Sequence, residues 1–293
     1  MSACELLDKL SACEPGRARV AVVAAHPDDA VLGAATVLRS ARELVLIHLT
    51  DGAEADGAGA DARLRELDRA LAVLGVRPRL RLRYGLTDQE TVFHLPGLVR
   101  RLSHDLRGCE AVLTHAYEGG HPDHDSAAAA VQLACLYADG EPMESIVRLE
   151  FAGHHACGGA LIAGRFHPDP SAPEREVDAA PSDRRARADA LACFTTQADA
   201  LARVGFEAER LRLAPVYDFR RPPPSGEALY DQRGCSLSSA EWRAITGLHA
   251  PSARPGAQSG EALGDGVQGG QATPVGLSAS GGAWAGPAEA PQP

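Results

Sequence analysis

The chain has 293 residues, which is long enough to bury a large core as one or two domains. Its formal net charge of −10 and its 4% of aromatic residues argue against a protein that neutralises nucleic-acid phosphates or stacks single-stranded bases. No run approaches the roughly 18 apolar residues that a membrane span needs, and MSACELLDKL carries acids where a signal peptide has an apolar core.

The seven cysteines are odd in number and form no C-x-x-C pair, so neither a disulfide framework nor a structural zinc cluster is expected. We therefore expect a cytoplasmic protein with reduced thiols, without a membrane span and without a nucleic-acid partner. The sequence does not predict the oligomeric state.

Short apolar runs alternate with helical patterns along most of the chain. Strands are expected at 19–26, 43–50, 79–86, 109–116 and 145–153. Helices are expected at 29–41, at 60–76 with Gly75 as the cap, and at 97–107, 125–137 and 182–204. This alternation predicts an α/β fold: a Rossmann-like, mostly parallel sheet flanked by helices, with ligands collected at the carboxyl ends of the strands.

Segment 208–232 is expected to wrap the edge of the domain. From about residue 251 the chain is rich in Gly, Ala, Ser and Pro and has almost no apolar clusters. Such a composition cannot offset the entropy of ordering, so we expect residues 251–293 to form a disordered tail. The sequence contains neither a phosphate-binding G-x-x-x-x-G-K-[ST] loop nor a G-x-S-x-G nucleophile turn.

Two similar stretches, AAHPDDAVLGAA (24–35) and EGGHPDHDSAA (118–128), follow predicted strands and lead into predicted helices. Proline suits the first turn of a helix, so Pro27 and Pro122 are each expected to open one. A third His-Pro-Asp, in FHPDP (166–170), is followed at once by a second proline and opens no helix. His167 is therefore expected in a surface loop.

The two helix-opening stretches predict a metal site at the carboxyl edge of the sheet. His26, Asp29 and His124 supply two imidazoles and a carboxylate, a set that suits Zn²⁺ and also Fe²⁺ or Co²⁺, with a fourth position left for water. Asp28 is then placed to take a proton from that water. His121 is expected to face a developing oxyanion, with Asp123 orienting it and favouring its protonated form.

The sequences AHPDDAVLGAA and HAYEGGHPDHDSAA resemble the LmbE-like, or PIG-L, family of zinc-dependent N-deacetylases, from about residue 18 to residue 232. The resemblance implies the same three metal ligands, with Asp28 as base and His121 as acid or electrophile tuned by Asp123. It also implies that Arg63 and Asp88 bind substrate, although Arg63 fits a solvated helix face equally well. The usual HPDDE motif has Ala30 at its fifth position here.

These observations predict that residues 1–250 form a deacetylase domain. The expected activity is metal-dependent removal of an acyl group, with acetyl the expected one, from an N-acylated amino sugar or related small-molecule conjugate. Two alternatives stay open: a catalytically silent, metal-bound protein that binds sugar conjugates, and a plain α/β binding protein whose histidines serve as caps and core. Substrate choice is expected to lie in loops 51–62, 86–95 and 151–160. His154, His155 and Cys157 are read as loop polarity rather than as a second metal site.

Overall fold

The computed structural model describes residues 1–14, 16–53, 59–137 and 146–249. In this part of the chain a seven-stranded sheet has the strand order β3-β2-β1-β4-β5-β9-β8. Its strands are β1 (Arg19–Ala24), β2 (Glu43–Thr50), β3 (Leu80–Leu86), β4 (Ala111–His115), β5 (Val147–Phe151), β8 (Arg175–Glu176) and β9 (Arg210–Leu213). Strands β1 to β5 pair in parallel, whereas β9 runs antiparallel to β5 and β8. The expected α/β fold with a mostly parallel sheet is confirmed.

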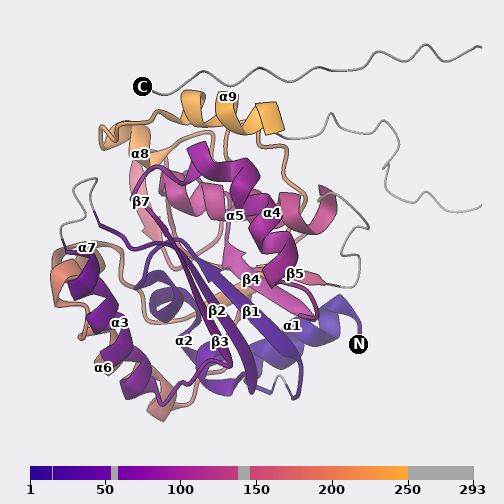
Figure 1. Cartoon of the computed structure of the whole chain (residues 1–293), viewed down its shortest axis with the longest axis vertical. Coiled ribbons are helices and arrows are strands. Elements are labelled where there is room, and N and C mark those ends of the chain that lie inside the picture. The colour runs from indigo at the N-terminus through magenta and orange to yellow at the C-terminus, as the bar shows by residue number, and fades with distance from the viewer. Residues whose placement is uncertain (15, 54–58, 138–145, 250–293) are drawn as a thin grey trace, which may run out of the picture. The chain divides into compact units, whose positions relative to one another are not determined.

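Helices cover both faces of the sheet (Figure 1). The helices of the described residues are α1 (Ala3–Ser11), α2 (Asp29–Ser40), α3 (Ala60–Leu74), α4 (Leu95–Asp105), α5 (Pro122–Tyr137), α6 (Pro181–Leu191), α7 (Ala198–Val204), α8 (Leu229–Gln232) and α9 (Ser239–His249), with 3-10 turns η1 (Thr91–His94) and η2 (Thr195–Gln197). One core cluster joins the sheet to α1, α2, α3 and α6, and a second joins it to α4, α5 and α9. None of the helices in these ranges has the length and apolar character that crossing a bilayer requires.

Strand β1 is buried on both faces, as its unbroken apolar run predicts. Val20 and Val22 belong to the first core cluster, whereas Ala21 and Val23 belong to the second. This alternation places β1 in the middle of the sheet, between β2 and β4. The loop that follows β1 therefore starts from a strand that is hydrogen-bonded on both edges, to β2 and to β4.

Most predicted elements are present with boundaries shifted by a few residues, but the predicted helix 182–204 is wrong. The chain forms α6, then η2, then α7, and the regular helix stops before Phe194. The reason is a distant carboxylate: Glu66 of α3 accepts hydrogen bonds from the hydroxyls of Thr195 and Thr196 at 2.7 and 2.6 Å. Threonine side chains that bind elsewhere favour a turn over a continuous helix.

Other differences lie in segments that were read as loops. Segment 208–232 contains strand β9 and helix α8, so it extends the sheet as well as covering its edge. Segment 151–160 contains β6 (His154–Cys157), which forms an antiparallel hairpin with β7 (Ala160–Ala163). Pro122 opens α5 as expected, whereas α2 begins at Asp29 and leaves Pro27 in the preceding turn. The tail predicted at 251–293 lies outside the described residues.

The strand order determines where a ligand can bind. The chain proceeds from β1 outward through β2 to β3, and then returns to place β4 on the other side of β1. In open α/β sheets such a reversal leaves a crevice outside the carboxyl ends of the two central strands. The two His-Pro-Asp stretches follow β1 and β4, so the topology brings both to this crevice.

A buried ion pair interrupts helix α2 one turn after its start. Ala34 has non-helical dihedral angles (φ −147°, ψ 22°), and the backbone bond from the Thr36 N–H to the Leu32 carbonyl is replaced. The Thr36 N–H donates to the Glu209 carboxylate at 3.1 and 3.2 Å, while Arg187 donates to the Leu32 carbonyl at 2.6 and 3.2 Å. Arg187 and Glu209 lie 3.3 Å apart and are both buried, so the two charges cap the two helical halves.

Replacement of Glu209 by alanine should lower the free energy of unfolding by about 3–5 kcal/mol, because it leaves the Arg187 charge buried and unpaired. Urea unfolding followed by circular dichroism measures this loss. The control is Glu43→Ala, which removes the exposed partner of Arg79 and should cost about 0–1 kcal/mol. Equal losses in the two variants would show that the pair inside α2 contributes no more than a surface pair.

Candidate active site

Histidines and aspartates gather at the carboxyl edge of the sheet, most of them from the β1–α2 and β4–α5 loops. In the described residues, three overlapping groups of side chains have donor atoms that all lie within 4.8 Å of one another. These groups are His26, His121 and His124; His26, Asp88, His121 and Asp123; and Asp29, His115 and His124. The predicted ligands His26, Asp29 and His124 are distributed over them, so every predicted ligand lies in a possible metal group.

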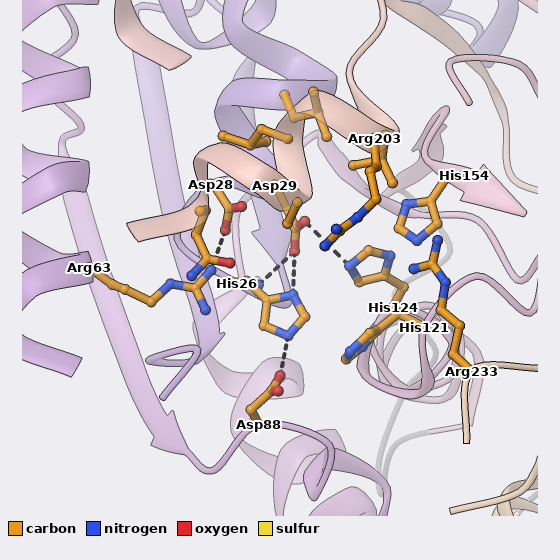
Figure 2. A pocket seen from close by; sticks show the side chains of 15 residues that line it. His26, Asp28, Asp29, Arg63, Asp88, His121, His124, His154, Arg203 and Arg233 are labelled. Carbon is orange, nitrogen blue, oxygen red and sulfur yellow. Dashed lines mark hydrogen bonds and ion pairs between the residues drawn. The ribbon is translucent and has the colours of Figure 1, made fainter. Parts of the chain in front are cut away.

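Asp29 lies between the two predicted histidine ligands (Figure 2). Its Oδ2 is 3.0 Å from His26 Nδ1, and its Oδ1 is 3.3 Å from His124 Nε2. In a tetrahedral zinc site, ligand atoms about 2.0–2.2 Å from the ion lie about 3.3 Å apart. Each of these two spacings matches that of a ligand pair around a divalent ion, but the carboxylate meets the two imidazoles through different oxygens, and the three residues do not together form one of the groups above.

The backbone and the neighbouring charges hold Asp29 in place. Its Oδ2 also accepts a hydrogen bond from the His26 backbone N–H at 2.7 Å. Burial opposes ionisation, but the imidazoles of His124, His26 and His115 hold the pKa of Asp29 well below its usual value. An ionised carboxylate is the form that binds a cation.

Asp28 and Arg63 form a buried ion pair in the wall of the pocket. Arg63 Nη2 donates to Asp28 Oδ1 at 2.6 Å, and its Nη1 donates to the Gly52 carbonyl. Gly52 has a φ of +65°, and a side chain there would collide with the guanidinium. Burial and the Asp29 charge raise the pKa of Asp28, an effect that Arg63 and His26 oppose. Arg63 thus contacts the predicted base, and its predicted contact with substrate stays a prediction.

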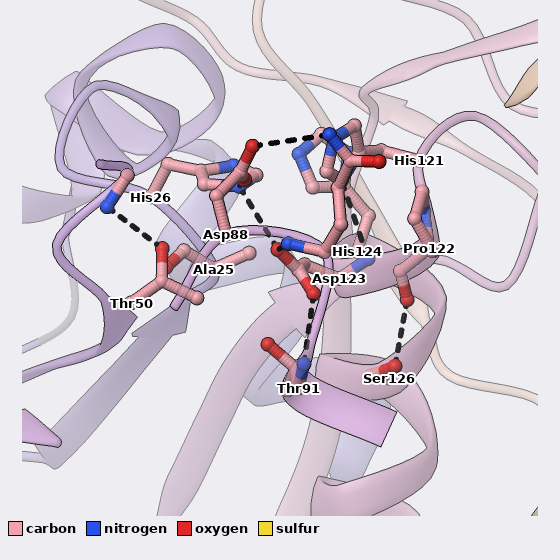
Figure 3. A network of polar contacts seen from close by, with 12 residues as sticks. Ala25, His26, Thr50, Asp88, Thr91, His121, Pro122, Asp123, His124 and Ser126 are labelled. Atoms are coloured by element: carbon pink, nitrogen blue, oxygen red, sulfur yellow. Dashed lines mark hydrogen bonds and ion pairs between the residues drawn. The ribbon is translucent and has the colours of Figure 1, made fainter. Parts of the chain in front are cut away.

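Asp88 and Asp123 lie on the far side of the His26 ring (Figure 3). His26 Nε2 is 2.7 Å from Asp88 Oδ1 and 3.3 Å from Asp123 Oδ2. A histidine that ligates a metal through one nitrogen is usually oriented by a carboxylate at the other. Asp88, predicted to bind a sugar hydroxyl, is therefore also placed to orient His26.

The position of Asp123 differs from the one expected. Its carboxylate accepts from the backbone N–H groups of Gln89 at 2.7 Å and Thr91 at 3.2 Å (Figure 3). The contact with His121 is instead made by the Asp123 backbone N–H, which donates to His121 Nδ1 at 3.2 Å. Burial and the neighbouring His26 and His124 lower the pKa of His121 to about 4, although Asp123 raises it. The Asp123 charge thus acts on His121 in the expected direction but is outweighed by burial, and the role of Asp123 in catalysis stays a prediction.

Sequence reasoning assigned no role to several residues that the structure places at the site. His115, at the end of β4, stacks on His124 with ring centroids 4.1 Å apart, and its Nε2 accepts from the Ala25 N–H at 3.0 Å. His154, which had been read as a loop residue, lies with its ring centroid 5.4 Å from that of His124. The terminal position of His115 on a strand next to HPDH was a usable signal for it. His154 is separated in sequence from both motifs, and no local pattern indicates it.

These side chains line a cavity of about 180 Å³ at the carboxyl edge of the sheet (Figure 2). Its polar walls carry the predicted ligands together with Asp28, Arg63, Asp88, His121 and His154. The rest of the wall comes from α2, η2, α7 and the residue after α8, with Leu32, Gln197, Ala200, Leu201, Arg203, Val204 and Arg233. Predicted metal ligands and predicted proton-transfer residues of the two motifs therefore open into one pocket.

The fold and the site define an α/β protein with a candidate divalent-metal centre. Residues 21–135 match the family model described as PIG-L: GlcNAc-PI de-N-acetylase. This segment contains both His-Pro-Asp motifs of the site. No curated protein matches the sequence significantly.

Solved structures with a similar fold include two deacetylases. The A40926 pseudoaglycone deacetylase Dbv21 has 18% identity and a TM-score of 0.50, covering 68% of this chain and 97% of its own. A triple mutant of a deacetylase of the teicoplanin biosynthetic pathway has 16% identity and a TM-score of 0.50, covering 68% and 99%. A conserved protein from Thermus thermophilus has 24% identity and a TM-score of 0.48, covering 68% and 95%. At such identities the likeness to the two deacetylases establishes the fold.

Protein purified without a histidine tag should bind one divalent ion per chain, measured by zinc titration against a chromogenic chelator. Asp88→Asn, which alters only the residue that orients His26, should weaken binding by roughly 10–100-fold. His124→Ala removes a ligand atom and should weaken it further. His104→Ala, at an exposed position on α4, is the control and should bind as the wild type does. Undiminished zinc affinity in the His124→Ala protein would rule out the proposed ligand set.

Proposed function

We propose that this protein is a metal-dependent hydrolase that removes an acyl group, in the simplest case acetyl, from the nitrogen of an amino sugar or a related small-molecule conjugate. The observation that carries the proposal is the placement of the buried Asp28 carboxylate beside the His26, Asp29 and His124 donors in one pocket. The family match of residues 21–135 supports hydrolytic deacetylation. We propose residues 1–250 as the catalytic domain.

The donor set supports zinc as the bound ion, and Fe²⁺ or Co²⁺ suit the same ligands. His26, Asp29 and His124 would hold the ion, and Asp88 and Asp123 would keep the His26 ring oriented. When bound, such an ion supplies Lewis-acid chemistry, which withdraws electron density from nearby oxygen atoms. The seven cysteines are unpaired, which supports the cytoplasm as a reducing compartment for the protein.

The protein's own residues would divide the proton transfers between them. Asp28 takes a proton from the attacking water. Burial and the adjacent Asp29 charge both raise the pKa of Asp28, and a raised pKa favours proton uptake. Arg63 keeps the Asp28 carboxylate facing the pocket through its 2.6 Å contact. His121, on the other wall, donates a hydrogen bond to the oxyanion of the tetrahedral intermediate. The C–N bond then breaks, and the leaving nitrogen takes up the proton held by Asp28.

The departure from the HPDDE motif leaves these groups in place. Ala30 is fully buried in the first core cluster and lies on α2 directly after Asp29. It occupies an apolar position, and each predicted ligand and proton-transfer residue is present. This observation favours an enzyme over the alternative of a silent conjugate-binding protein.

An Asp28→Asn variant should retain its metal and lose about 10²–10⁴-fold in kcat, because the amide cannot accept the water proton. Acetate release from N-acetylglucosamine conjugates measures the rate, and metal analysis of the same preparation shows that the site is loaded. Asp68→Asn, on the exposed face of α3, serves as the control. Unchanged turnover in Asp28→Asn would remove this residue from the role of base, and no acetate release by the wild type would favour the silent binding protein.

A further inference from the structure

A second cavity, of about 580 Å³, lies on the other side of strand β6 from the active site, and we call it the hairpin cavity. Successive side chains of a strand point to opposite faces, and here His154 lines the active-site pocket whereas His155 lines the hairpin cavity. Ile162, the partner of His155 in β7, lines it as well. The two cavities share no lining residue, so the β6–β7 hairpin is a wall between them.

The third His-Pro-Asp stretch of the sequence forms another wall of the hairpin cavity, since all five residues of FHPDP border it. The backbone N–H of His167 donates to Glu118 Oε1 at 2.8 Å, which ties this stretch to the loop after β4. The turn of the hairpin is held by Glu227, whose carboxylate accepts from the backbone N–H groups of both turn glycines at 3.1 Å. Both walls are anchored to the rest of the fold, as is usual in a preformed ligand site.

His155 brings an unsatisfied polar atom to the hairpin cavity. The residue is 2% exposed, and its Nδ1 has no hydrogen-bond partner among the described residues. Glu118 Oε2 lies 3.6 Å from this nitrogen, which is beyond hydrogen-bond distance. Buried polar atoms without a partner are uncommon and costly. Because His155 borders the cavity, a bound molecule is placed to supply the missing partner.

The charged side chains that border the hairpin cavity are instead bound to protein groups. Arg165 donates to Glu174 at 2.8 Å, and Arg212 donates to Glu150 at 2.8 Å. Asp169 accepts from the backbone N–H and the hydroxyl of a neighbouring serine at 2.8 and 2.6 Å. A charged ligand would have to give up water without finding a free counter-charge here, so the cavity favours an uncharged ligand.

The apolar part of the lining is dominated by rings. Its side chains are Ile162, Phe166, Pro168, Pro170, Ala172 and Pro173. The Arg212 guanidinium lies 4.2 Å from the centre of the Phe166 ring and holds that ring in place. Flat walls of this kind suit an aromatic ring, which gains more from an aromatic neighbour than its buried area alone provides. Apolar walls with a small number of polar groups are typical of small-molecule sites.

We propose that the hairpin cavity is a second ligand site, which binds a small uncharged aromatic molecule that carries a hydroxyl group. The ring packs against Phe166 and the prolines, and the hydroxyl forms a hydrogen bond with His155 Nδ1. Both groups can donate or accept, the imidazole according to its tautomer. The site is separate from the proposed deacetylase chemistry, because none of its lining residues borders the active-site pocket.

The first experiment measures binding to the full chain with its metal site loaded. The probe is 2-naphthol, and octan-1-ol serves as a flexible alcohol of similar hydrophobicity. Equilibrium dialysis should show one saturable 2-naphthol per chain and weaker binding of octan-1-ol, since only the aromatic ring gains from the ring-lined walls. Tighter binding of octan-1-ol would overturn the aromatic class of ligand. No saturable binding of 2-naphthol would overturn the site.

The second experiment locates the bound probe in the unaltered protein. Cys157 borders the hairpin cavity and is exposed, whereas Cys4 is exposed on α1 and does not border it. Saturating 2-naphthol should slow the alkylation of Cys157 by iodoacetamide several-fold and leave that of Cys4 unchanged, as measured by mass spectrometry. An unchanged alkylation rate at Cys157 would place the binding elsewhere and overturn the proposal.

Variants assign the binding to residues. His155→Phe keeps a ring and removes both nitrogens, so it should weaken 2-naphthol binding by about 3–10-fold and leave naphthalene binding unchanged. Ile162→Trp should fill the cavity and abolish the binding of both probes. The control is Leu161→Trp, at a 36% exposed position on β7 outside the lining, which should bind both probes as the wild type does. Undiminished 2-naphthol binding in Ile162→Trp would overturn the assignment to this cavity.

Discussion

The site depends on one carboxylate that faces two imidazoles. Asp29 lies 3.0 Å from His26 and 3.3 Å from His124, residues that are 98 positions apart in the chain. Because Asp29 is buried, leaving its charge unpaired would be costly, so the two loops must meet for the fold to be stable. The same contact that joins the β1–α2 and β4–α5 loops also sets the spacing of the donor atoms.

Contacts in the sheet and in helix α2 hold Asp29 and the two histidines in position. The parallel sheet fixes the ends of β1 and β4 side by side, and the Ala25 N–H donates to His115 across them. The short first segment of α2, which carries Asp29, is separated from the rest of the helix by the inserted Arg187 and Glu209 charges. These long-range contacts let the first turn of α2 adopt the orientation that the pocket requires, independently of the second part of the helix.

The sequence predicted the parts that depend on local pattern. The apolar runs located β1, β2 and β4, and the paired His-Pro-Asp stretches located His26, Asp29 and His124 near one another, because strand ends of a parallel sheet meet at one edge. Features that depend on tertiary contact were missed. Glu66 breaks the helix at Thr195 from 129 residues away, and Arg203 and Arg233 reach the pocket from segments without a motif.

Anomalous X-ray diffraction from crystals grown with zinc, recorded on both sides of the zinc absorption edge, tests the central claim most directly. One strong anomalous peak per chain is expected, about 2.0–2.2 Å from His26 Nδ1, a carboxylate oxygen of Asp29 and His124 Nε2. A peak on the other side of the His26 ring, among Asp88, His121 and Asp123, would contradict the proposed ligand set, as would the absence of a peak at this edge of the sheet.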